Sequence, residues 1–537
     1  MLSLAIHLSS VISLVGLGCL LYFIFNHSVE YPKHQTVVVF FNSTAKIGQT
    51  DDDYICATLD WWPSDKCDYG SCSWGMASLL NLDLNNTILS NAVKAFAPLK
   101  IRMGGTLQDK LTYQTDEEQS CNPFVRNSSQ LLGFSEGCLP MARWDDLNRF
   151  FKETGAIVTF GLNALKGRTI NPDGSTVGAW DPSNAEYLLR YTVNKGYNIY
   201  GWEFGNELSG NGIGAKVRAQ QYASDVKTLQ NLLQKMYVGS ESKPIVLGPG
   251  GFFDATWFSE FIGETTKSVQ AITHHVYNLG AGDNSDLIGR ILNPSILDSE
   301  ANVFSTLQQE IRRSGTSAIA WVGEAGGAFN SGRNHVTNAF VMSFWYLDQL
   351  GMAATYNTKT YCRQTLIGGN YGLLDKSNFA PNPDYYSALL WHRLMGKQVL
   401  STSVTGTRKL RAYTHCSKQS QGITLLLINI DAEVTFEVNI TTENGSVSVE
   451  NRGPFARKSK FEKMPIISTR EEYHLTAPNK DLSSKKVLLN WKVLTVDSSS
   501  GIPPLKPAIV NINEPITVVP FSIVFVHIPS IVPYACT

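Results

Sequence analysis

The sequence lacks an excess of charge of either sign. Its 45 lysines and arginines nearly balance 46 aspartates and glutamates, which leaves a formal net charge of −1. It also lacks the residue spacing of zinc fingers and of helix-turn-helix proteins, so nucleic acid is not an expected partner. Charged residues make up only 17% of the chain and apolar residues 43%. This composition is typical of a large folded body and not of long disordered segments.

Cysteine is scarce as well, with nine residues in the chain. Cys19 lies in an N-terminal apolar segment, and the eight others form an even number that an oxidising compartment could pair. Cys67 and Cys72 have no second C-x-x-C or histidine pair that would complete a metal site, so we expect disulfides and no metal ion. Cys121 and Cys138 are the clearest local pair.

Residues 2–25 carry no formal charge if His7 is neutral, and they form the longest apolar run of the chain. A basic n-region and an Ala-x-Ala cleavage site are both missing. We expect a cleaved secretory signal within residues 1–30, with an uncleaved anchor that would hold the protein at a membrane as the alternative. Sequons for N-glycosylation begin at Asn26, Asn42, Asn85, Asn127, Asn439 and Asn444. They favour a secreted glycoprotein, with a vacuole or lysosome as another destination.

Between residues 51 and 392, short apolar runs alternate with helix-like segments. The helix-like segments include residues 144–155 and 184–197. The strand-like runs span residues 51–63, 99–105, 156–165, 199–208, 244–251, 271–277 and 317–327. Repeated β-then-α units predict a parallel sheet, and its common closed form at this length is a (β/α)8 TIM barrel.

The pattern changes near residue 395. Alternating runs without intervening helices span residues 422–430, 434–440, 486–496 and 515–528, and they predict an all-β sandwich over residues 393–537. Another strand is expected at residues 36–41, within a leading segment 31–50 that would join the sandwich. Two domains are expected from the length of 537 residues. We expect a monomer.

Two predicted barrel strands end in a carboxylate. Glu207 follows the apolar run "GWEF", and Glu324 follows "SAIAWVG". The two are separated by three βα units of about 39 residues, so they would end the fourth and seventh strands and face one another across the mouth of the barrel. A glycosidase requires two such carboxyl groups, one to protonate the leaving oxygen and one as an anion. The alternative for Glu324 is a helix cap or a loop salt bridge.

Other polar residues lie at the same strand ends. In residues 201–207, strand alternation places Glu207 on the opposite face from Asn206, whose amide could contact a sugar hydroxyl. His275 and Tyr277 share a strand face, and the tyrosine could hydrogen-bond an ionised carboxylate. A buried structural role is the alternative for His275. Glu203 is expected to pair with Arg102 and not to act as the acid.

Several motifs together resemble the heparanase-like β-glucuronidases of glycoside hydrolase family 79, from about residue 36 to Cys536. They are "RMGGTLQD", "FGLNAL", "WEFGNEL", "HHVYNLG", "VGEAGGAFNSGR" and "GGNYGLLD". The stretches "ICATLDWWPSDKCDYGSCSW" and "NPDYYSALLWHRLMG" are similar to the plant branch of that family. The resemblance implies a retaining glycosidase with a (β/α)8 barrel, a β-sandwich and no cofactor.

The resemblance also implies roles for individual residues. Glu207 would be the general acid/base and Glu324 the nucleophile. Asp60, Thr106 and Asn206 would contact sugar hydroxyls, whereas Tyr371, the backbone of Gly369 and the nearby Gln364 would meet the carboxylate of a uronic acid. Cys416 and Cys536 would form a disulfide in the sandwich.

We therefore predict an enzyme that removes β-linked glucuronic acid, or its 4-O-methyl ether. The substrates would be extracellular cell-wall glycans such as arabinogalactan proteins, or small glucuronides. One alternative is an endo-acting hydrolase of an acidic polysaccharide. Another, of a different class, is a glycan-binding wall protein without catalysis.

Overall fold

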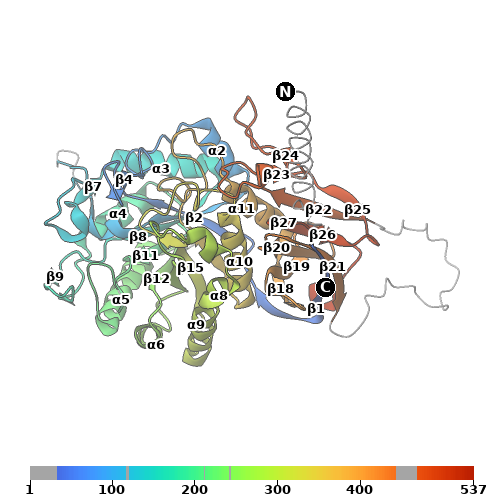
Figure 1. Ribbon diagram of the computed structural model, residues 1–537. Helices are drawn as coiled ribbons and strands as arrows, with labels where there is room; N and C mark the ends of the chain where they lie inside the picture. The colour runs from blue at the N-terminus through green and yellow to red at the C-terminus, as the bar shows by residue number, and fades with distance from the viewer. Residues whose placement is uncertain (1–32, 116–119, 211, 241–242, 443–468) are drawn as a thin grey trace, which may run out of the picture.

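The computed structural model describes residues 33–115, 120–210, 212–240, 243–442 and 469–537. The expected signal or anchor at residues 1–30 and the sequons at Asn26 and Asn444 lie outside this part of the chain. Within it, no helix combines the length and the apolar character needed to cross a membrane. The described residues form a helix-covered barrel and a β-rich C-terminal body beside it (Figure 1).

Eight parallel strands form a closed barrel, in which the last strand pairs with the first. This arrangement confirms the predicted (β/α)8 fold. In chain order the strands are β2 (Ile55–Asp60), β5 (Lys100–Gly104), β8 (Ile157–Leu162), β11 (Gly201–Phe204), β12 (Ile245–Phe252), β13 (Ala271–Val276), β15 (Ile319–Ala325) and β17 (Thr360–Arg363). The prediction missed β17, a strand of only four residues.

Helices cover the outside of the barrel (Figure 1). They are α2 (Thr87–Lys94), α3 (Met141–Thr154), α4 (Ser183–Asn194), α5 (Ala219–Met236), α6 (Ala255–Glu264), α7 (Leu287–Ile291), α8 (Pro294–Leu297), α9 (Ala301–Ser314), α10 (Met342–Thr355) and α11 (Pro383–Leu394). Their boundaries follow local chemistry. The Asp254 side chain accepts from the Trp257 amide at the start of α6, and Gly155 adopts a left-handed conformation after α3.

The loops of the barrel contain short strands and turns. They are β3 (Cys67–Asp68), β4 (Ser71–Cys72), β6 (Leu111–Tyr113), β7 (Gly137–Leu139), β9 (Thr169–Ile170), β10 (Thr176–Val177), β14 (Gly280–Ala281) and β16 (Ala328–Phe329), with 3-10 turns η1 (Thr106–Lys110), η2 (Leu131–Gly133) and η3 (Asp298–Glu300). The paired strands β3 and β4 form a hairpin that matters for the site described below.

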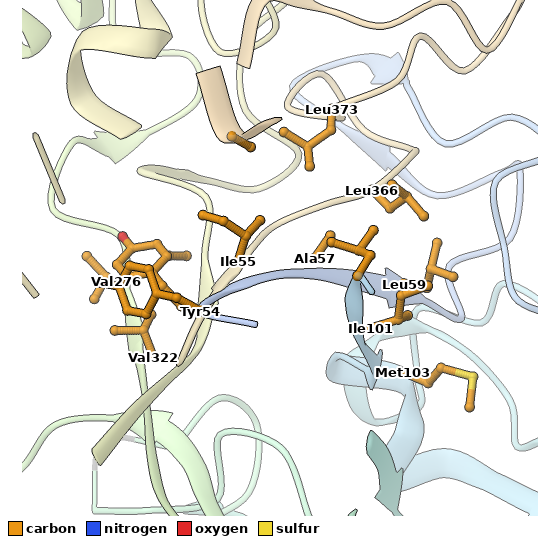
Figure 2. Packing of buried hydrophobic residues seen from close by; sticks show 14 of the residues in the cluster. Tyr54, Ile55, Ala57, Leu59, Ile101, Met103, Val276, Val322, Leu366 and Leu373 are labelled. Carbon is orange, nitrogen blue, oxygen red and sulfur yellow. The ribbon is translucent and has the colours of Figure 1, made fainter. Parts of the chain in front are cut away.

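Residues of each barrel strand alternate between two environments. In β2, Ile55, Ala57 and Leu59 pack in the main hydrophobic core together with Ile101 and Met103 of β5 (Figure 2). The residues between them belong to the opposite face, because successive side chains of a strand point to opposite sides. On that inner face Arg102 of β5 bonds to Glu203 of β11, so the interior of the barrel is polar.

The C-terminal body is built on an eleven-stranded sheet. Its strands are β1 (Lys33–Gln49), β18 (Met395–Val404), β19 (Leu410–Ser417), β20 (Ile423–Asn429), β21 (Val434–Thr442), β22 (Thr469–Thr476), β23 (Leu488–Leu489), β24 (Lys492–Val493), β25 (Ala508–Asn511), β26 (Ile516–Val518) and β27 (Ser522–Ile528); 3-10 turns η4 (Pro478–Lys480) and η5 (Tyr534–Cys536) accompany them. A second hydrophobic core includes Val39, Leu427, Phe436 and Val524.

Three predicted strands differ from the structure. The run 486–496 is a hairpin of β23 and β24, because Asn490 and Trp491 adopt positive φ and reverse the chain. The run 515–528 contains β26 and β27. The predicted strand 36–41 is the centre of the longer β1, which lies between β18 and β21 and appears as a blue strand among orange and red ones (Figure 1).

The barrel and the sheet meet at α10, which is buried along most of its length. The Asp348 carboxylate of α10 accepts hydrogen bonds from Arg411 Nε at 2.8 Å and from the Tyr413 hydroxyl at 2.7 Å. Gly351, one turn further along α10, lies against the ring of Tyr413, where a Cβ would stand 2.3 Å from a ring carbon. Ion pairing and close packing therefore join the two bodies.

All eight cysteines outside the N-terminal segment are paired. The pairs are Cys56–Cys362, Cys67–Cys72, Cys121–Cys138 and Cys416–Cys536. The first joins the first and last barrel strands and was not anticipated. Of the sequon asparagines in the described residues, Asn85, Asn127 and Asn439 are exposed and Asn42 is partly buried. Glycosylation at these positions stays a prediction.

Candidate active site

The carboxyl ends of the barrel strands surround a cavity of about 470 Å³, which we call the active-site cavity. Its lining includes seven predicted site residues, namely Asp60, Thr106, Glu207, Tyr277, Glu324, Gln364 and Tyr371. Asn206, His275 and Gly369 do not line it directly. Glu207 follows the fourth strand, β11, and Glu324 lies in the seventh, β15, as the spacing predicted.

Glu207 reaches the cavity through a turn and not through a continued strand. The strand ends at Phe204, and Gly205 and Glu207 both adopt positive φ, 68° and 55°. The Glu207 amide donates to the Gly250 carbonyl at 2.7 Å, which fixes the turn. The strand alternation used in the prediction therefore does not extend to Asn206 and Glu207, because the chain leaves the strand after Phe204.

Glu207 is bonded to the imidazole of His275. The distance between Glu207 Oε1 and His275 Nδ1 is 2.9 Å, and both side chains are at least nine-tenths buried. His275 lies in β13 and faces the interior of the barrel. Its bond to Glu207 places it beside the cavity and not alone in the hydrophobic core. Among the described residues, its other ring nitrogen has no hydrogen-bond partner.

Glu324 is held by two donors. The Tyr277 hydroxyl donates to Oε1 at 2.6 Å, and Arg102 Nη1 donates to Oε2 at 2.7 Å. Burial alone would raise the pKa of Glu324, but the charges of His275 and Arg102 and these two hydrogen bonds outweigh it. The pKa of Glu324 therefore lies below its ordinary value, and the carboxylate is ionised.

Arg102 connects the site to the interior of the barrel. Besides Glu324, its guanidinium donates to Glu203 Oε2 at 2.7 Å and to the Asn206 side-chain oxygen at 2.8 Å. The predicted pairing of Glu203 with Arg102 is confirmed. Thr273 donates to the other oxygen of Glu203 at 2.8 Å. Glu203 is thus fully engaged, whereas Glu207 is the carboxylate that borders the cavity.

One carboxylate oxygen of Glu207, one of Glu324 and a ring nitrogen of His275 all lie within 4.8 Å of one another. In the described part of the chain, these three side chains are the one group close enough to hold a metal ion. However, both oxygens of Glu324 already accept hydrogen bonds, and the Arg102 cation lies beside them. The arrangement fits proton transfer better than metal binding.

A second polar group lies across the cavity. Gln364 donates from Nε2 to Asp60 at 2.7 Å and to the Tyr371 hydroxyl at 3.3 Å, and its side-chain oxygen accepts from Thr58. Burial and the nearby Glu324 raise the pKa of Asp60 well above its ordinary value. Gly369, at a φ of 59°, packs beneath the Tyr371 ring, where a Cβ would clash.

Sequence reasoning missed half of the cavity wall. The missed lining residues are Trp62, Lys66, Asp68, Ile213, Phe252, Phe329, Asn330 and Ser331. Lys66 and Asp68 flank Cys67, which was considered only as a metal ligand or a disulfide partner. The signal in the sequence is the close spacing of two charged residues in a loop that the disulfide stiffens. Arg102 was linked to Glu203 but not to Glu324.

Comparison with known proteins agrees with this geometry. The family profile described as "Glycosyl hydrolase family 79, N-terminal domain" matches residues 36–351, which contain both Glu207 and Glu324. The chain belongs to glycosyl hydrolase family 79. It is therefore a glycoside hydrolase, and the predicted enzyme class is confirmed.

Individual relatives cover nearly the whole family 79 chain. Heparanase-like protein 3 of Arabidopsis thaliana is 55% identical over 504 residues, 93% of this chain and 94% of the relative. Baicalin-beta-D-glucuronidase of Scutellaria baicalensis is 45% identical over 498 residues, 90% of each chain. The crystal structure of a 4-O-alpha-L-rhamnosyl-beta-D-glucuronidase from Fusarium oxysporum has the same fold, with a TM-score of 0.63, 15% identity and coverage of 91% of this chain and 100% of that one.

Proposed function

We propose that this family 79 enzyme is a retaining β-glucuronidase, with Glu324 as nucleophile and Glu207 as general acid/base. The observation that carries the proposal is the separation of at most 4.8 Å between carboxylate oxygens of the two residues. Retaining glycosidases place their carboxyl groups about 5 to 5.5 Å apart, whereas inverting enzymes leave about 6.5 to 9.5 Å for a water molecule.

The surroundings of the two carboxyl groups support these roles. Arg102 and Tyr277 keep Glu324 ionised, as a nucleophile requires. Glu207 has no arginine or lysine within ion-pairing distance among the described residues; its partner is His275. In the proposed mechanism Glu207 therefore takes the role of proton donor and acceptor, whereas Glu324 stays an anion until it forms a bond.

In the proposed reaction, Glu324 Oε attacks the anomeric carbon while Glu207 gives its proton to the departing glycosidic oxygen. The C–O bond to the leaving group breaks and a glucuronyl ester of Glu324 forms. Water then attacks the same carbon, Glu207 takes one of its protons, and the ester bond breaks. The product is glucuronic acid in the original β configuration.

The choice of glucuronides rests on the relatives and on the cavity. A relative 45% identical over 90% of each chain is named a baicalin β-D-glucuronidase. Trp62, Ile213, Phe252 and Phe329 give the cavity apolar side chains, and Ile213 and Phe329 are 47% and 40% exposed. Apolar walls at the opening suit an aglycone with an apolar or aromatic face, and we propose small glucuronides beside cell-wall glycans as substrates.

We also propose that the enzyme acts outside the cytosol, after secretion. Four disulfides within the described residues support an oxidising compartment, since such pairs are rare in the cytosol. Exposed sequons at Asn85, Asn127 and Asn439 support passage through the secretory pathway.

The test is release of 4-nitrophenol from its β-glucuronide by secreted wild type, Glu207→Gln and Glu324→Gln, each with and without azide. We expect Glu324→Gln to be inactive, and Glu207→Gln to be slow but accelerated by azide, because azide needs no base to attack the glucuronyl ester. NMR of the first product should show the β anomer. A folded wild type that leaves this substrate intact would disprove the proposal and favour a glycan-binding protein.

A further inference from the structure

The active-site cavity is lined by more acidic than basic side chains. Four carboxyl groups line it, those of Asp60, Asp68, Glu207 and Glu324. A single basic side chain, that of Lys66, lines it among the described residues. Arg102 lies behind Glu324 and its three donor groups already bond to Glu203, Asn206 and Glu324. Lys66 is therefore the cationic side chain of this wall that an anionic substrate could meet.

Lys66 begins the disulfide-closed hairpin, residues 66–72, and two neighbours fix its position, Asp68 on the hairpin and Trp62 before it. Its ammonium nitrogen lies 2.6 Å from Asp68 Oδ1 and 4.7 Å from the centre of the Trp62 ring. The side chain is only 19% exposed. Asp68 is the one hydrogen-bond partner of this nitrogen among the described residues, so N–H groups remain for a ligand.

Asp68 is anchored on its other side to the far wall of the cavity. Ser331 Oγ donates to Asp68 Oδ2 at 2.5 Å and accepts from Trp74 Nε1 at 2.9 Å. The Ser331 carbonyl in turn accepts from the Asn370 amide at 2.8 Å, next to Tyr371. The Asn330 side chain also donates to the Tyr69 hydroxyl at 3.0 Å. These bonds tie the hairpin to the loop after Glu324 and hold Lys66 in place.

We propose that Lys66 adds a cation to the predicted contacts of the glucuronide carboxylate, which are Tyr371, the Gly369 backbone and Gln364, and so strengthens the binding of acidic substrates. The proposal rests on the function proposed above. A lysine held over an aromatic ring and against one carboxylate presents its remaining donors without losing much side-chain freedom on binding. A substrate carboxylate would be the second anion bound to the Lys66 ammonium, and Asp68 would be the residue that positions Lys66.

The experiment compares 4-nitrophenyl β-glucuronide with its uncharged methyl ester, which differ only at the carboxyl group. The proteins are wild type, Lys66→Met, Lys66→Arg and, as a control, Lys227→Met. Lys227 is an exposed lysine on α5 that pairs with Glu264. The control removes one positive charge far from the cavity. Thermal unfolding shows whether each variant is folded.

We expect Lys66→Met to lower kcat/KM for the acid by about ten- to a hundredfold, mainly through KM, and to leave kcat/KM for the ester nearly unchanged. Lys66→Arg should recover most of the loss. Added salt should raise KM for the acid in wild type and much less in Lys66→Met. If hydrolysis of the ester is too slow to measure in wild type, the test is the loss of kcat/KM for the acid in Lys66→Met and its recovery in Lys66→Arg.

Two outcomes would overturn the proposal, and they differ from a failure of the proposed function. If the folded Lys66→Met variant hydrolyses the acid with the KM of wild type, Lys66 does not bind the substrate, although the glucuronidase function is confirmed. An equal loss on acid and ester would assign Lys66 a role in shaping the hairpin only. If wild type hydrolyses neither compound, the glucuronidase function itself is wrong, and the inference about Lys66 is wrong with it.

Discussion

The interior of the barrel and the core of the C-terminal sheet bury opposite kinds of side chain. Inside the barrel, Arg102, Glu203 and Glu324 are each less than 9% exposed and lie in one network of ions and hydrogen bonds. In the sheet, the core consists of apolar side chains such as Leu427 and Val524. Buried charges are costly unless each has a partner, so their concentration in one region marks where the chain serves chemistry and not stability.

Glu324→Gln should have the largest effect on activity and little effect on stability. Loss of the nucleophile should lower kcat by roughly a thousandfold or more, while the sheet and its unfolding are unaffected. Steady-state hydrolysis of 4-nitrophenyl β-glucuronide and a urea titration of the same preparation measure both. A variant that keeps more than a tenth of wild-type kcat would contradict the assigned role.

Arg102→Met should damage both properties at once. Glu203 and Glu324 would keep their burial but lose their common cation, and unbalanced buried charge costs about 3 to 5 kcal/mol of unfolding free energy. Activity should fall with it, since the pKa of Glu324 would rise. Chemical denaturation provides the free energy. A variant of wild-type stability would show that the network is balanced without the arginine.

Leu427→Ala tests the other region. Its side chain is fully buried in the sheet core, and truncation should cost about 3 kcal/mol of unfolding free energy. We expect kcat/KM to remain at the wild-type value at temperatures where the variant is folded. A clear fall in kcat/KM under those conditions would mean that the sheet sets the geometry of the site as well.

The smallest effect is expected from Tyr277→Phe. The hydroxyl stabilises the ionised form of Glu324 and so lowers its pKa. Without it the pKa of Glu324 rises, and the carboxylate becomes protonated at a higher pH. The acidic limb of the kcat/KM profile should therefore move toward neutral pH, with about a tenfold loss at most near the optimum. An unmoved limb would assign the acidic limb to another group.

Much of this architecture could be predicted from local patterns. Glu207 and Glu324 were identified because each ends an apolar run, and their spacing gave the strand numbers. Strand β17 has the sequence TYCR, which contains no apolar run of the kind that predicted the other barrel strands. The turn that carries Glu207 depends on the positive φ of Gly205 and Glu207, which a strand pattern does not contain.

Long-range contacts account for the rest of what was missed. The bond from Arg102 to Glu324 joins residues 222 positions apart, and the Cys56–Cys362 disulfide joins residues 306 apart. Neither leaves a periodic signal in the sequence. The same holds for Lys66, whose place in the cavity depends on how one hairpin folds over the mouth of the barrel.

Strand β1 has a consequence for how the chain can be assembled. It precedes the barrel in sequence, yet it pairs with β18 and β21, which follow the barrel. On the ribosome, β1 emerges early and must remain without its sheet partners while the whole catalytic body is synthesised. A chain cut after α11 would lack β18 and β21 and would leave both edges of β1 without a partner strand. Removing the C-terminal sheet would therefore present an aggregation-prone edge.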